Sequence, residues 1–254
     1  GHGSFFESKR LSEVVGYFLG VLTFTPYHRW HHSHLIHHRT VGNLDKRGTG
    51  DVWTLTVDEY KALTAQKKLY YRIYRNPLIM FGIGAAGMFL ISNRFTRKSF
   101  SRREKISIYL NNLGIAVLAT VMCLTIGWKA YLLIQLPVMY FASIAGVYLF
   151  YLQHQFEGVH WYKEQEWDFK TVAIMGSSFF KLPVILQWFS GNIGFHHVHH
   201  LSSKIPNYRL EKCHNDTSLF ETVVPIPFFK GFRMLKLKLW DEKAGRLVRF
   251  NEVG

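Results

Sequence analysis

The sequence predicts an all-α integral membrane protein, made of a transmembrane helical hairpin, interfacial helices and a cytosolic helical cap. Three observations predict this class. Two neighbouring apolar runs are long enough to cross a bilayer, basic residues flank the apolar segments, and two histidine clusters of identical spacing lie on either side of the hairpin in the sequence. We expect the 254 residues to form one domain, 1–254.

The composition favours a membrane protein over a soluble basic protein. The chain is 48% hydrophobic and 16% aromatic, yet its formal net charge is +14. This combination is typical of a membrane protein with basic cytoplasmic loops. We expect no nucleic-acid partner, because the charges flank apolar segments and no recognition motif is present. The two cysteines, Cys123 in an apolar run and Cys213 in a polar tail, do not indicate a disulfide framework.

The hairpin is predicted at residues 106–127 and 131–152. Each run reaches the roughly 20 residues that a spanning helix needs. Neither run contains His, Asp, Glu, Lys or Arg. The connector holds Trp128 and Lys129, which predicts a tight turn with an interfacial aromatic side chain.

Two other apolar runs, residues 14–25 and 78–92, are shorter. Several basic residues lie on each side of the second run, at 67–75 and at 94–105. Because basic flanks stay on the cytoplasmic side, this segment should lie at the interface or re-enter rather than cross. The chain then crosses out and back once between the histidine clusters, which places both on the cytoplasmic face.

The two clusters share the pattern H-x-x-H-H, and residues i, i+3 and i+4 lie on one face of a helix. Neutral imidazole suits iron, copper, nickel and zinc. Six such ligands exceed what one ion takes and indicate two ions, and two redox irons are the usual solution when O2 must be activated. The ligands would be His34, His37, His38, His196, His199 and His200. However, His28, His31 and His32 spell an overlapping copy, and spacing alone does not choose between the two.

Four stretches resemble the histidine motifs of membrane fatty acid desaturases. GHGSFF is similar to the end of the first box, and Gln153-His154 to an extra histidine that ends the last span. The residues around His34, namely Pro26, Tyr27, Trp30 and Ser33, are similar to the second box. Those after His200, namely Leu201, Pro206 and Tyr208, are similar to the third box. The resemblance covers essentially the whole chain and is strongest to the acyl-lipid branch that makes Δ12 or ω-3 double bonds.

This resemblance implies a four-span membrane enzyme that desaturates a fatty acyl chain with O2 at two iron ions. It adds His2 and His154 to the ligands and, through Ser33 and the following GNLD, favours His34, His37 and His38 over the overlapping copy. His31 and His197 would then not bind metal. The first box needs a further histidine four positions before His2, so we expect a fragment that lacks the first pair of spans.

The reaction also needs electrons from outside the chain. No cysteine cluster or haem motif is visible, so we expect an external donor such as ferredoxin or cytochrome b5, attracted by the basic cytosolic face. The substrate is expected to be a fatty acyl lipid, held in an apolar tunnel that enters the cap from the membrane. The membrane would be the bacterial inner membrane, or that of the endoplasmic reticulum or plastid in a eukaryote.

Two other functions stay open at this point. A related di-iron hydroxylase or ketolase, acting on a carotenoid or an alkane, would use the same histidine boxes. A histidine-rich metal-binding or transport protein of the membrane is disfavoured, because a transporter places polar ligands within its spans.

Smaller expectations concern single residues and the C-terminal part. His160 and His214 are expected to be solvated, and nothing in the sequence selects which of Asp45, Asp51 and Asp168 supports the metal ligands. The prolines at 225 and 227 should break regular structure. The basic, aromatic stretch 228–240 fits either contact with the membrane surface or packing within the cap.

Overall fold

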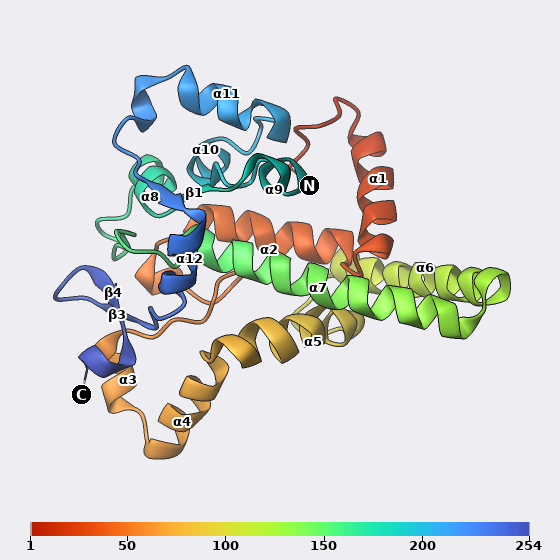
Figure 1. Cartoon of the computed structure of the whole chain (residues 1–254), viewed down its shortest axis with the longest axis horizontal. Coiled ribbons are helices and arrows are strands. Elements are labelled where there is room, and N and C mark those ends of the chain that lie inside the picture. Colours follow the sequence, from red (N-terminus) through yellow and green to blue (C-terminus); the bar gives the residue numbers. More distant parts are fainter. Residues whose placement is uncertain (1, 254) are drawn as a thin grey trace. The chain divides into compact units, whose positions relative to one another are not determined.

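The computed structural model describes residues 2–253, and it confirms a helical protein with two long apolar helices (Figure 1). The chain forms two compact units, the first from the N-terminus to Leu35 and from Asn76 to Tyr148, the second from Ile36 to Arg75 and from Leu149 onward. The α-helices are α1 (Lys9–Leu22), α2 (Tyr27–Thr40), α3 (Val57–Ala62), α4 (Ala65–Tyr74), α5 (Ala85–Leu90), α6 (Arg102–Ile126), α7 (Trp128–His154), α8 (Phe169–Met175), α9 (Val184–Phe189), α10 (His196–Leu201), α11 (Leu210–Asn215) and α12 (Phe228–Met234).

Short elements complete the fold. The 3-10 turns are η1 (Leu44–Lys46), η3 (Ser92–Arg94), η4 (Asn207–Arg209), η5 (Ser218–Phe220) and η6 (Phe250–Glu252), and η2 (Leu78–Gly84) is a π-helix. The strands are β1 (Phe179–Lys181), β2 (Pro225–Pro227), β3 (Leu239–Asp241) and β4 (Arg246–Val248).

The first unit contains the hairpin of α6 and most of α7 (Figure 1). Ser101 and Glu104 cap the start of α6 reciprocally, and Gly127, with φ of 84°, ends it. The connector is shorter than predicted, because Trp128 and Lys129 already belong to the first turn of α7. Large apolar side chains along both helices, such as Leu124 and Leu133, are exposed. A bilayer is the solvent in which such faces are stable.

The apolar run 78–92 folds as η2 and α5 in the first unit. Only α6 and α7 are single helices long and apolar enough to span, among the residues that the structure describes. The segment Leu78–Arg94 reaches spanning length only together with α4, as a broken span or a re-entrant loop. A broken span would cross the membrane and a re-entrant loop would not, so the expectation that this run does not cross stays a prediction.

The N-terminal half of α2 is fixed to α6 within the first unit. The buried carboxylate of Glu104 lies 3.5 Å from Arg29 and 3.1 Å from the Nδ1 atom of His32. The Ser107 hydroxyl accepts a hydrogen bond from the backbone N–H of His28 at 3.0 Å. These contacts hold the helix that carries the second histidine box.

The second unit is the helical cap with two small sheets. Strand β1 pairs with β2 in parallel, and β3 pairs with β4 antiparallel. The expectation that Pro225 and Pro227 break regular structure was wrong, because both lie in β2. Proline is tolerated in an edge strand, where a missing N–H disrupts no second neighbour.

The stretch 228–240 divides between the two interpretations that the sequence left open. Phe229 in α12 is 80% exposed, whereas Trp240 in β3 is 2% exposed and stacks on Trp161 with ring centroids 5.2 Å apart. The second half of the stretch is therefore part of the cap's core. Contact of the first half with the membrane stays a prediction.

Candidate metal centre

Four buried histidines of the second unit converge on one point. Helix α2 supplies one, the last residue of α7 a second, and α10 two that are one helical turn apart: His37, His154, His196 and His200. One ring nitrogen from each lies within 4.8 Å of the others. Such a cluster of imidazoles in a dry interior is the donor set of a transition-metal site.

For two of these histidines, the contacts of Nδ1, the ring nitrogen that points away from the cluster, fix the tautomer. Nδ1 of His37 lies 2.6 Å from a carboxylate oxygen of Asp51, and Nδ1 of His154 lies 3.1 Å from the carbonyl oxygen of Gly176. Since both oxygens can only accept, both Nδ1 atoms carry the proton of the neutral ring. The Nε2 atoms of His37 and His154 therefore present lone pairs.

These two lone pairs face each other. The Nε2 atoms of His37 and His154 are 3.0 Å apart, and Nε2 of His196 is also 3.0 Å from that of His154. Between His37 and His154 no proton remains to form a hydrogen bond, so a cation is needed to offset the repulsion. Two imidazole nitrogens bound to one ion at about 2.1 Å and at a right angle lie about 3.0 Å apart. The residues therefore fit a bound metal ion.

His200 gives an independent indication. It is 1% exposed, and within the described part of the chain neither of its ring nitrogens has a hydrogen-bond partner. The Nδ1 atom of His196 is likewise buried and without a partner there. Leaving buried polar atoms without partners is costly, and a metal ion that binds the imidazole of His200 removes that cost.

The electrostatics favour neutral imidazoles. Burial, followed by the neighbouring imidazoles, lowers the pKa of His196 and of His200 well below the usual value of 6.5. The same causes lower the pKa of His199 to about 3. Near neutral pH these rings are therefore deprotonated, which is the form that binds metals.

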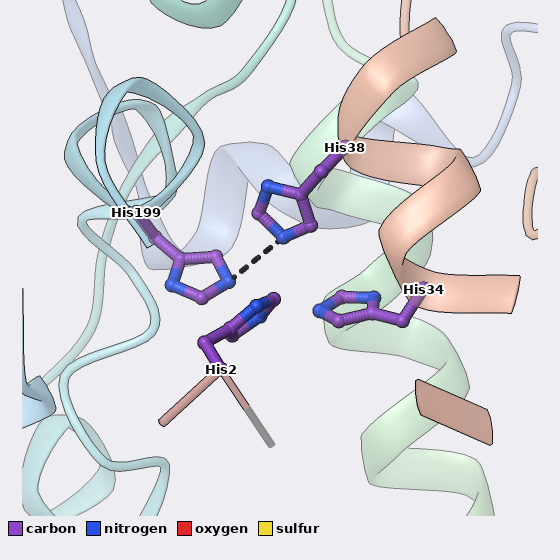
Figure 2. A group of neighbouring side chains, drawn as sticks. All are labelled: His2, His34, His38 and His199. Atoms are coloured by element: carbon purple, nitrogen blue, oxygen red, sulfur yellow. Dashed lines mark hydrogen bonds between the residues drawn. The ribbon is translucent and has the colours of Figure 1, made fainter. Parts of the chain in front are cut away.

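Two further pairs of histidines lie close together, one pair within each unit. In the second unit, Nε2 of His38 lies 3.2 Å from Nε2 of His199, and Figure 2 shows these two rings pointing toward each other. In the first unit, the rings of His2 and His34 have centroids 4.8 Å apart. Because His34 and His38 are one turn apart on the continuous helix α2, they share a face of that helix.

The overlapping copy of the second box has different neighbours. Nε2 of His28 lies 4.0 Å from Glu13, and Nδ1 of His32 lies 3.1 Å from Glu104. The ring of His31 lies tilted against that of Tyr27, with ring centroids 5.8 Å apart. Acidic neighbours occupy this part of α2, whereas the C-terminal half of the helix faces the histidines of the cap. That contrast supports His37 and His38 over the overlapping copy as metal ligands.

His197 points away from the cluster, as the sequence predicts. Its Nε2 lies 2.9 Å from Nδ1 of His214, and aromatic rings of Phe179 and Phe220 surround it. His160 is exposed, as expected. The expectation that His214 is solvated was wrong, because it is half-buried between His197 and Phe220.

The structure also distinguishes the three aspartates. Asp51 accepts from His37, whereas Asp45 accepts a backbone N–H from Glu164 at 2.8 Å and Asp168 caps α8 through Thr171. The sequence could not predict the hydrogen bond from Nδ1 of His154 to the Gly176 carbonyl, because every residue carries a backbone carbonyl. A cavity of about 30 Å³ lies beside Asp51 and His154, enough for water but not for an acyl chain.

Comparison with known proteins gives one consistent result. The family model described as fatty acid desaturase matches residues 1–222. A fatty acid desaturase of Bacillus subtilis (strain 168) is 48% identical over 252 residues, which cover 99% of this chain and 72% of that protein.

More distant relatives carry more specific names. The sn-1 acyl-lipid omega-3 desaturase (ferredoxin) of Nostoc sp. (strain 36) is 26% identical, over 95% of this chain and 67% of its own length. The Delta(12) fatty acid dehydrogenase of Crepis alpina is 26% identical, over 84% of this chain and 60% of its own length.

Proposed function

The chain belongs to the fatty acid desaturase family, and from this premise we propose that it introduces a double bond into a lipid-linked acyl chain at a centre of two iron ions. The overall reaction removes two hydrogen atoms from adjacent methylenes. Together with two electrons and two protons from outside, these hydrogens reduce one O2 to two water molecules. Two iron ions, when bound, supply the oxidising power that an unactivated C–H bond requires and that acid–base side chains lack.

The first ion would be held by the buried group of the second unit, His37, His154, His196 and His200. The observation that carries this assignment is the contact between His37 and His154, whose Nε2 lone pairs face each other at 3.0 Å. The second ion would be held by His38 and His199 of this unit, and the resemblance of the histidine boxes makes His34 and His2 its further candidate ligands. The adjacent positions of His37 and His38 on α2 and of His199 and His200 on α10 support two neighbouring ions.

Apolar side chains pack beside the proposed ligands. Phe150 packs on His37 with ring centroids 5.2 Å apart, and Val198 of α10 is fully buried. A dry, neutral environment strengthens metal binding and excludes side reactions of the oxidant. The acyl chain would reach the centre from the membrane, and the electrons would come from an acidic donor such as ferredoxin or cytochrome b5. We place the histidine boxes on the cytoplasmic face.

The test is expression of the gene in a host whose lipids carry only saturated and monounsaturated chains. We expect new double bonds in membrane lipids, at a position that gas chromatography with mass spectrometry of derivatised fatty acids identifies. Hydroxylated or ketone products would instead indicate a related oxygenase. An unchanged lipid profile, with an iron-loaded protein present in the membrane and a donor co-expressed, would refute the proposed function.

A further inference from the structure

Asp51 stands out among the carboxylates of the second unit because it contacts a proposed metal ligand. Its oxygen accepts the Nδ1–H of His37 at 2.6 Å, and the side chain of His37 is fully buried while that of Asp51 is 20% exposed. A short hydrogen bond to a charged acceptor is about twice as strong as a neutral one. The carboxylate thus holds both the proton and the ring plane of His37.

The loop that carries Asp51 is itself fixed on both sides. Before it, the guanidinium of Arg47 donates to the carbonyl oxygens of Leu44 at 2.7 Å and of Thr54 at 2.9 Å. After it, the buried Arg75 donates to the Thr54 hydroxyl at 3.2 Å. Gly50, with φ of 77°, supplies the left-handed turn that directs the following residue. Asp51 is therefore held by a rigid loop, as a precise ligand support requires.

The consequence is a defined direction for the lone pair of His37. A neutral imidazole carries its proton on either nitrogen, and only a proton on Nδ1 leaves Nε2 available toward His154. Without the carboxylate, the ring can adopt the other tautomer or rotate about its side-chain bonds. Both changes remove the nitrogen from the point at which the four histidines converge.

We propose that Asp51 is a positioning residue for one ion of the pair, because it locks His37 in the tautomer and orientation that present Nε2 to the metal. This inference rests on the proposed function, and it concerns only the ion bound by His37, His154, His196 and His200. The hydrogen bond of Asp51 goes to His37, a ligand of this ion alone, so the other ion should be affected much less.

The experiment measures binding of Fe²⁺ to the full chain in detergent under anaerobic conditions, with a chelator as competitor. For Asp51→Ala we expect one of two ions to bind about 10–100-fold more weakly, the usual cost of losing a residue that supports a ligand. Asp51→Asn should recover part of this affinity, since its amide oxygen still accepts from Nδ1. The matched control is Asp45→Ala, which removes a carboxylate from the same loop region but none from a histidine.

Each outcome decides between the claims. Two ions bound to Asp51→Ala with the wild-type affinities would overturn the role of Asp51 alone. Equal weakening of both ions, with a lower thermal midpoint of the metal-free protein, would also overturn it, because a general folding defect would explain the loss. A wild-type chain that binds fewer than two ions would overturn the two-iron proposal itself.

Discussion

The positions of single protons decide what the histidine cluster can bind. His37 and His154 each give their Nδ1 proton to an oxygen, which leaves their Nε2 lone pairs 3.0 Å apart. His200 has two buried nitrogens without partners in the described chain. His200 would be a poor core residue without a cation, because its buried ring nitrogens cost free energy and gain no hydrogen bond within the described chain in return.

Substitution of single histidines tests whether they bind the metal ions. We expect His37→Ala and His199→Ala to form no product, because loss of a ligand changes both the affinity and the redox chemistry of the ion. His197→Ala should retain measurable product, since His197 contacts His214 rather than the cluster. The measurement is the fraction of desaturated acyl chains at equal protein levels.

The second-box assignment has its own control, His31→Ala, which should also retain product. An inactive His31→Ala beside an active His34→Ala would contradict the assignment. The ligands would then be the overlapping set, with His28 and His32.

A buried lysine outside the centre gives a pH prediction. Burial, followed by the charge of Arg75, lowers the pKa of Lys238 to about 7, and its Nζ donates to the Arg75 carbonyl at 2.6 Å. The unfolded chain keeps the usual value of 10.5 and so binds more protons than the folded chain between about pH 7 and 10. Stability should therefore rise with pH in this window, by at most about 1.4 kcal/mol per pH unit.

The measurement is the thermal midpoint of the detergent-purified protein at several pH values above 7, compared with Lys238→Met. The variant should show a flatter dependence, because the titrating group is gone. Identical slopes in both proteins would show that Lys238 is not the group responsible.

At the scale of elements, the helical spacing of histidines and the apolar runs of the sequence predicted most of the helices that carry the candidate metal centre. The i, i+3, i+4 spacing predicted that His196, His199 and His200 converge, whereas the structure puts His196 and His200 in the buried four-histidine group and His199 beside His38. The apolar runs located α6 and α7 to within a few residues. The short strands β1 to β4 were not foreseen, since three-residue pairings between distant segments have no periodicity to detect. The support from Asp51 and Gly176 depends on tertiary contacts, which spacing does not encode.

The hairpin of α6 and α7 gives a topological prediction. If both histidine boxes face the cytoplasm, single cysteines at Thr40 and Ser202 should react from the same side of the membrane, and one at Trp128 from the other. Accessibility labelling of intact cells and of inverted vesicles, in a chain whose Cys123 and Cys213 are replaced by serine, measures this. Reaction of positions 40 and 202 from opposite sides would contradict the proposed arrangement.

At the scale of the whole molecule, the family membership and the histidine cluster point to the same function. The match to the fatty acid desaturase family accounts for the acyl substrate and the membrane helices. The buried imidazoles offer a site for the metal that the proposed reaction needs. The central claim is therefore that this chain holds two iron ions through its histidines.

The most direct test is the metal content of the protein purified from iron-replete cells without chelators. Inductively coupled plasma mass spectrometry should find about two iron ions per chain, and His200→Ala should lower that number. Stoichiometric zinc in place of iron, together with desaturation that survives removal of iron by a chelator, would contradict the account.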